Sequence, residues 1–77
     1  MTSAQVRAAR GLIGWTVRDL AEKAKVHRNT VSNIETGRYG GSPDALSAIR
    51  AALESAGVEF IAENGGGAGV RLRHRRD

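Results

Sequence analysis

The chain has 77 residues, enough for one small domain with a modest hydrophobic core. It has no cysteine and only two histidines, His27 and His74, so a disulfide scaffold is excluded and a zinc site is disfavoured. Twelve lysines and arginines against eight acids give a net charge of +4, and ten of the twelve are arginine, whose planar donors suit phosphates and base edges. This balance favours an anionic partner. No stretch resembles a signal peptide or reaches transmembrane length, so we expect a cytoplasmic protein without a membrane partner.

Helical periodicity dominates the first three-quarters of the chain, where apolar residues recur three and four positions apart. Four helices are expected, at about residues 3–13, 16–24, 28–36 and 43–56. Thr16 and Asp19 predict a capping box at the start of the second helix. Gly37 is placed to end the third helix in the left-handed conformation, and Ser42-Pro43-Asp44 is a strong start for the fourth.

The last part of the chain changes character. VEFIA is apolar and β-branched, ENGGGAG is rich in turn residues, and GVRLR alternates apolar residues with arginine, which predicts a β-hairpin at about 58–73 and a frayed tail at 74–77. Such a hairpin is unstable alone, so it must pack on the helices or pair with the hairpin of another subunit. The fold class is therefore a mainly α single domain, 1–77, with a C-terminal hairpin. The candidate residues for a dimer interface are Val58, Phe60, Ile61, Val70 and Leu72.

The short connection Lys25-Val26-His27 between the second and third helices fits a helix-turn-helix, whose second helix enters the DNA major groove. Apolar residues of these helices face inward, which leaves a polar edge formed by Arg28, Asn29, Ser32 and Asn33. Arginine can bond guanine O6 and N7 bidentately, and asparagine can do the same for adenine N6 and N7. A merely hydrated helix surface is the alternative, but such a surface would more often carry lysine and glutamate.

The segment TVRDLAEKAKVHRNTVSNIETG resembles the helix-turn-helix of the phage lambda-type repressor and Cro proteins, the XRE family. The family pattern is present as Leu20-Ala21, Ala24, Val26, Thr30-Val31-Ser32, Glu35 and Gly37. The resemblance runs from Arg10 through the fourth helix. The tail GVEFIAENGGGAGVRLR further resembles a compact bacterial subgroup whose single domain ends in a hairpin. The resemblance as a whole implies a lambda-repressor-like DNA-binding domain of four to five helices.

The resemblance also implies roles for individual residues. Arg28, Asn29 and Asn33 match the family's principal base-reading positions. Positions that match backbone or secondary contacts are Thr16, whose backbone N–H can also bind a phosphate, Thr30, Ser32, Arg38 and Tyr39. Arg10 and Glu35 match a structural ion pair that ties the first helix to the recognition helix.

Three departures from the family pattern change the expected details. Val17 stands where the family usually has a glutamine that bonds phosphate or supports a base-reading side chain. Lys25 and His27 replace the glycine and serine of the common Gly-Val-Ser turn. Lys25 would be strained by about 1 kcal/mol if its φ is positive. His27 is a weaker N-cap than serine, so it either leaves N–H groups free for a DNA phosphate or contacts that phosphate itself as imidazolium.

These features predict a sequence-specific DNA-binding transcriptional regulator, a dimeric repressor that reads an inverted-repeat operator in double-stranded DNA with residues 28–36. Bound to DNA, it would be associated with the nucleoid. The alternative is an antitoxin- or antiactivator-type module that acts through a protein partner. The arginines of the tail leave three readings open: a DNA-backbone arm, a solvated strand face or an acidic-partner site. We find no nucleophile–base pair, carboxylate dyad or metal cluster, so neither enzyme activity nor a cofactor is expected.

Overall fold

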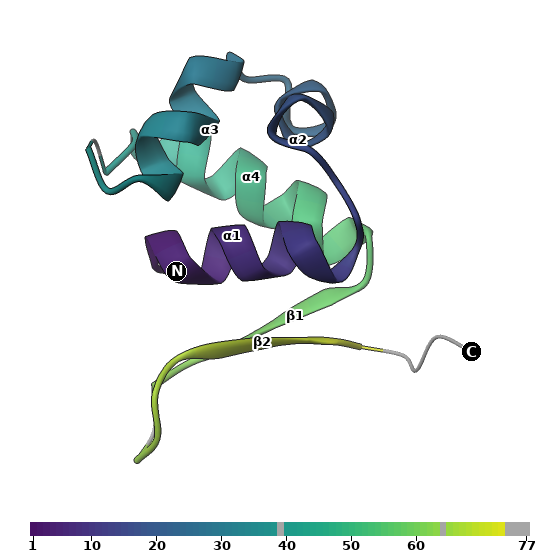
Figure 1. Cartoon of the computed structure of the whole chain (residues 1–77), viewed down its shortest axis with the longest axis vertical. Helices are drawn as coiled ribbons and strands as arrows, with labels where there is room; N and C mark the ends of the chain where they lie inside the picture. Colours follow the sequence, from purple (N-terminus) through teal and green to yellow (C-terminus); the bar gives the residue numbers. More distant parts are fainter. Residues whose placement is uncertain (39, 64, 74–77) are drawn as a thin grey trace.

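The computed structural model describes residues 1–38, 40–63 and 65–73. The described chain forms α1 (Ser3–Leu12), α2 (Val17–Ala24), α3 (Arg28–Glu35), α4 (Pro43–Ser55), β1 (Val58–Ile61) and β2 (Gly69–Leu72). The predicted mainly α domain with a C-terminal hairpin is confirmed, with four helices in the described part of the chain. None of these helices is long and apolar enough to cross a membrane. The hairpin lies along α1 and α4, on the side away from α2 and α3 (Figure 1).

Every helix starts at a side chain that accepts a hydrogen bond from the first turn. Thr2 and Thr16 form reciprocal capping boxes with Gln5 and Asp19, and Ser42 accepts from the N–H of Ala45. The fourth cap is His27, whose Nδ1 accepts from the N–H of Asn29 at 3.1 Å. Local sequence therefore fixes where the helices begin.

Helices α1, α2 and α3 end in the same Schellman pattern, in which the N–H groups of two successive residues after the helix donate to carbonyls of its last turn. Gly14 and Gly37 take the left-handed position after α1 and α3, with φ of 70° and 73°. After α2 the same position is occupied by Lys25, at φ 58° and ψ 42°. The N–H groups of Lys25 and Val26 bond to the carbonyls of Glu22 and Ala21 at 3.3 and 3.0 Å. The turn of the helix-turn-helix is thus built by a lysine in a conformation that favours glycine.

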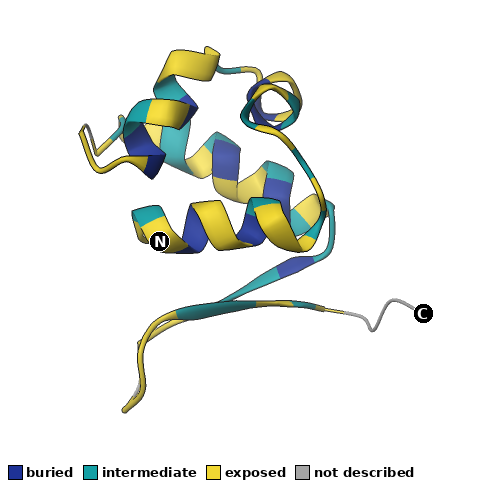
Figure 2. Cartoon of the chain, in the orientation of Figure 1, coloured by how far each residue is buried: buried dark blue, intermediate teal, exposed yellow. Residues whose placement is uncertain are grey.

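The core lies where the four helices meet, and β1 contributes to it. Its fully buried side chains are Val6, Ala9, Leu20, Val31, Ile49, Leu53 and Val58, and Figure 2 shows the buried residues on the inner faces of the helices. Val17 packs against this core, as do Trp15 and Leu46. Close packing also sets the entry to α4, because a side chain at Gly41 (φ 80°) would lie 2.8 Å from Cδ1 of Ile34.

The hairpin packs on the helices of its own chain. Its register pairs Val58 with Leu72 and Phe60 with Val70, which places these four apolar residues on one face. Val58 is fully buried there, so its prediction as a dimer-interface residue is wrong: the chain's own core already covers it. Phe60 and Val70 are partly buried against the same core, and Leu72 is half-buried.

The other face of the hairpin is exposed. It carries Ile61, which is 38% exposed, and an ion pair between Glu59 and Arg71. Hydrogen bonding to Arg71, together with its charge, lowers the pKa of Glu59. Of the remaining tail arginines, Arg73 is exposed, while Arg75, Arg76 and the rest of the predicted frayed tail lie outside the described residues. Of the predicted interface residues, Ile61 is thus the one that faces solvent most clearly.

Candidate nucleic-acid interface

The surface of α3 divides into a buried side and a polar edge. Val31, Ile34 and Glu35 are buried against the domain, whereas Arg28, Asn29 and Ser32 are exposed. Asn33 and Thr30 are half-buried and lie next to each other at one margin of the exposed edge. An exposed guanidinium and two carboxamides therefore share one side of an eight-residue helix, which is the chemistry needed to bond base edges in the major groove.

The first turn of this helix is capped by His27 rather than left open. Nδ1 of His27 accepts the bond from the N–H of Asn29, so the other ring nitrogen, Nε2, is the one that can act as a donor. We expected His27 to be a weak N-cap, and the structure shows that its side chain does cap one N–H of the first turn. In this arrangement Nε2 is the ring atom left to donate a hydrogen bond outside the cap. His27 is exposed, so that donor can reach a ligand outside the domain.

An open hollow of about 500 Å³ lies beside this first turn. Arg18, Lys25 and Arg28 place three cationic side chains around it, together with His27. One acid also lines it, Glu22, which is paired with Arg18 at 3.5 Å. The hollow is cationic on balance and adjoins the polar edge of α3, a position suited to a backbone phosphate next to the bases being read.

The far end of α3 is tied to α1 by an ion pair between Arg10 and Glu35. Nε and Nη2 of Arg10 each lie 2.9 Å from a different oxygen of the Glu35 carboxylate, and Nη1 donates to the carbonyl of Trp15. The Glu35 side chain is only 5% exposed. This hydrogen bonding, with the charge of Glu35, raises the pKa of Arg10. The residues that the resemblance paired are therefore in contact, and their bidentate geometry fixes the orientation of α3.

Two further residues of α1 hold the same end of α3, and the sequence did not reveal them. Ser3 Oγ donates to the carbonyl of Ile34 at 2.7 Å, and Nη1 of Arg7 donates to the carbonyl of Glu35. Ser3, Arg7 and Arg10 are spaced at i, i+4 and i+7, so they lie along one face of α1. A cation at the last carbonyls also interacts favourably with the helix dipole. Together these three residues form the α1 clamp on the recognition helix.

The residues predicted to contact the DNA backbone lie at both ends of the helix-turn-helix. Thr16 is exposed, but its backbone N–H already donates to Oδ2 of Asp19 at 2.9 Å, so the N–H predicted to bind a phosphate is occupied. The Thr16 hydroxyl accepts from the N–H of Asp19 and keeps its own proton to donate. Arg38 is exposed just beyond Gly37 and forms no ion pair within the described residues. Tyr39, predicted beside it, lies outside the described residues.

Two short helices joined by a tight turn, with the second exposing hydrogen-bonding side chains, define the class of helix-turn-helix DNA-binding domains. A family model described as "Helix-turn-helix domain" matches residues 3–60, and the chain belongs to this family. A comparison with curated proteins gave no match. Double-stranded DNA is accordingly the partner that both the family and the geometry indicate.

Proposed function

We propose that the chain is a sequence-specific transcriptional regulator of the phage lambda-type repressor and Cro group, and that it works as a dimeric, non-enzymatic repressor. One observation carries this proposal. The exposed edge of α3 presents Arg28 and Asn29 beside Asn33, while the other side of the same helix is fixed to α1 and the core. Rigid placement matters because a bidentate bond to a base tolerates little displacement.

In this proposal Arg28, Asn29 and Asn33 read bases, and Thr30 and Ser32 make secondary contacts. Arg38 and the Nε2–H of His27 donate to backbone phosphates at opposite ends of α3, and the Thr16 hydroxyl does so at the start of α2. Phosphate contacts set the register on the duplex, whereas base contacts choose the sequence. Repression follows when the bound protein covers promoter DNA.

A dimer is proposed because one eight-residue helix covers only a few base pairs. A two-fold pair reading half-sites about 34 Å apart would double the site and mirror an inverted repeat. The hairpin supports this arrangement with Ile61 and with two strands that pair with no third strand within the described chain. A stable interface needs about 800 Å² from each partner, so these edges must be joined by neighbouring surface.

Selection of bound sites from random duplex DNA tests the proposal. The wild-type chain should enrich one inverted repeat. Arg28→Ala should relax the preference at one position of each half-site by about 5- to 150-fold, the equivalent of about 1–3 kcal/mol. Arg50→Ala removes an exposed guanidinium from α4, away from the polar edge of α3, and should leave the selected site unchanged. Failure to enrich any duplex, or an unchanged site with Arg28→Ala, would contradict the proposal.

A further inference from the structure

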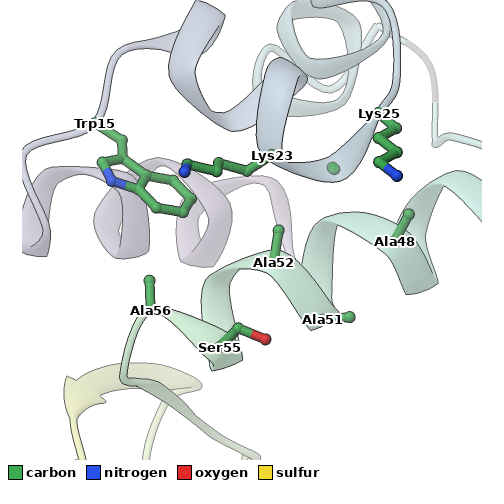
Figure 3. Close-up of a pocket in the computed structure, with 9 residues that line it drawn as sticks. Trp15, Lys23, Lys25, Ala48, Ala51, Ala52, Ser55 and Ala56 are labelled. Atoms are coloured by element: carbon green, nitrogen blue, oxygen red, sulfur yellow. The ribbon is translucent and has the colours of Figure 1, made fainter.

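A second surface of the domain, formed by α2 and α4, is hollowed and has no role in the function proposed above. It is a groove of about 580 Å³ lined by Trp15, Lys23, Ala24, Lys25, Ala48, Ala51, Ala52, Ser55 and Ala56. Trp15 and Lys25 lie toward opposite ends of it, with the alanines of α4 between them (Figure 3). Lys25 also lines the cationic hollow beside α3, whereas the other residues of the groove are not among those assigned to DNA contact.

The floor of the groove is apolar and shallow. Methyl groups of Ala48 and Ala52 in α4, and of Ala56 at its C-cap, project toward α2, and the half-buried indole of Trp15 closes one end. Small side chains let another backbone approach closely, and an exposed indole offers a large apolar surface with a polar N–H. From Ala48 to Ala56 the floor spans about 12 Å of helix axis, which matches two turns of a second helix.

The rim of the groove is cationic. Lys23 and Lys25 are both exposed, and neither forms an ion pair within the described residues. Both contribute to the lining, and Figure 3 shows the amino group of Lys23 beside the Trp15 ring. An occupant that buries apolar side chains on the floor would therefore gain from carboxylates on its flanks.

A second copy of this chain supplies few such carboxylates. In the described part of the chain, Glu22, Glu35, Glu54 and Glu59 are already paired with arginines, and Asp19 is held in its capping box. Two exposed acids, Asp44 and Glu63, are outside these pairs, and they lie on different elements, at the start of α4 and after β1. The chain's net charge of +4 opposes a contact between two cationic rims. Charge complementarity thus favours a different protein over self-association at this groove.

We propose that the α2–α4 groove binds an acidic amphipathic helix of a partner protein, with a bulky apolar side chain against Trp15 and carboxylates beside Lys23 and Lys25. The partner would bind the regulator through a surface centred on α2 and α4, and would so connect the regulator to a second protein. This mode is a helix laid in an apolar groove, with anchors at i, i+3 or i+4, and i+7.

Two synthetic peptides of about 20 residues, long enough to be helical in water, test the proposal on the full chain. Both contain the same leucine and phenylalanine stripe and no tryptophan; one carries glutamates on its flanks and the other carries lysines. Trp15 is the chain's only tryptophan, so its fluorescence reports occupancy of the groove. The acidic peptide should bind at least about tenfold more tightly than the basic one at low salt, and the difference should shrink as salt rises.

Matched variants locate the binding site. Ala51→Arg puts a long side chain into the groove from an exposed position of α4 and should abolish binding. Ala8→Arg makes the same change on the exposed face of α1 and should leave binding intact. Lys23→Glu combined with Lys25→Glu should reverse the preference between the two peptides.

Three results would overturn the proposal. Equal affinity for both peptides would show that Lys23 and Lys25 do not select an acidic partner. No binding of the acidic peptide would show that the groove does not accept an acidic amphipathic helix. If wild type forms a dimer that Ala51→Arg alone dissociates, the groove is a contact between copies of this chain. Operator binding is measured separately on the same variants, so loss of the groove and loss of DNA recognition can be told apart.

Discussion

Lys25 occupies the left-handed backbone position between α2 and α3, where a side chain crowds the following carbonyl. The equivalent positions after α1 and α3 are glycines with nearly the same φ. No hydrogen bond within the described residues involves the Lys25 side chain. The strain at this turn is therefore not offset by a side-chain hydrogen bond there.

We predict that Lys25→Gly stabilises the domain by about 0.5–1 kcal/mol. Relief of left-handed strain is worth about 1–2 kcal/mol, and the greater freedom of glycine in the unfolded chain removes part of that gain. Urea unfolding followed by circular dichroism measures the difference. Lys23→Gly is the matched control, because Lys23 lies inside α2 and should lose about 1 kcal/mol. A loss of stability in both variants would show that Lys25 is not strained.

The Arg10–Glu35 ion pair should contribute to the stability of the domain. Arg10→Met should cost about 2–3 kcal/mol, because it leaves the Glu35 carboxylate buried without a countercharge. The cost is below that of a fully buried pair since the Arg10 side chain is 23% exposed. Arg10→Met combined with Glu35→Leu should cost less than Arg10→Met alone, as no unpaired charge remains. Additive losses in the double variant would show that the two side chains do not interact.

Helix α1 is the element that joins the recognition helix to the hairpin. Its Ser3–Arg7–Arg10 face clamps α3, while its Gln5 side chain bonds to the hairpin. Nε2 of Gln5 donates to the carbonyls of Ile61 and Gly69 at 3.2 and 2.9 Å, and Oε1 accepts from Thr2. A single buried carboxamide thus closes the α1 cap and holds the ends of both strands.

Gln5→Ala should destabilise the domain by about 1–3 kcal/mol, because it leaves two carbonyls and one N–H without their partner. Compared with wild type, amide hydrogen exchange in Gln5→Ala should accelerate more in the hairpin than in α2 and α3. Ala4→Gly, at an exposed position of the same helix turn, controls for a general loosening of α1 and should not single out the hairpin. Uniform acceleration across the domain in Gln5→Ala would mean that Gln5 does not hold the hairpin in particular.

Some features of these elements depend on neighbouring residues, and others depend on contacts between distant segments. Helix starts and the left-handed Gly37 were predictable because caps and turns depend on residues within one turn of each other. The roles of Ser3, Arg7 and Gln5 were not, because their partners are backbone carbonyls 28 to 64 residues away. Such bonds depend on how helices cross, which no local pattern records.

The buried face of the hairpin also depends on tertiary packing. Val58, Phe60 and Ile61 are all apolar, so the strand has no clean alternation from which to choose its buried face. Packing against α4 settles the choice, with Val58 inside and Ile61 outside. Apolar character alone could not separate a core residue from an interface residue.

The salt dependence of DNA binding depends both on the cationic contacts of each chain and on the number of chains bound. The logarithm of the binding constant should fall linearly with the logarithm of salt, with a slope of about −0.9 per phosphate neutralised. In a dimer on an inverted repeat each phosphate contact occurs twice. Arg38→Ala should therefore make the slope shallower by about 2, against about 1 for a single chain.

Fluorescence anisotropy on the selected operator at several salt concentrations measures this slope, with light scattering to give the mass of the complex. Arg28→Ala should weaken binding mainly on the preferred sequence, whereas Arg38→Ala should weaken all duplexes alike. Arg50→Ala, an arginine held to Glu54 on α4, should leave the slope unchanged. If Arg38→Ala changes the slope by only about 1, and the complex has the mass of one chain on DNA, a monomer binds. The inverted-repeat model would then fail, while the assignment of Arg38 to a phosphate would stand.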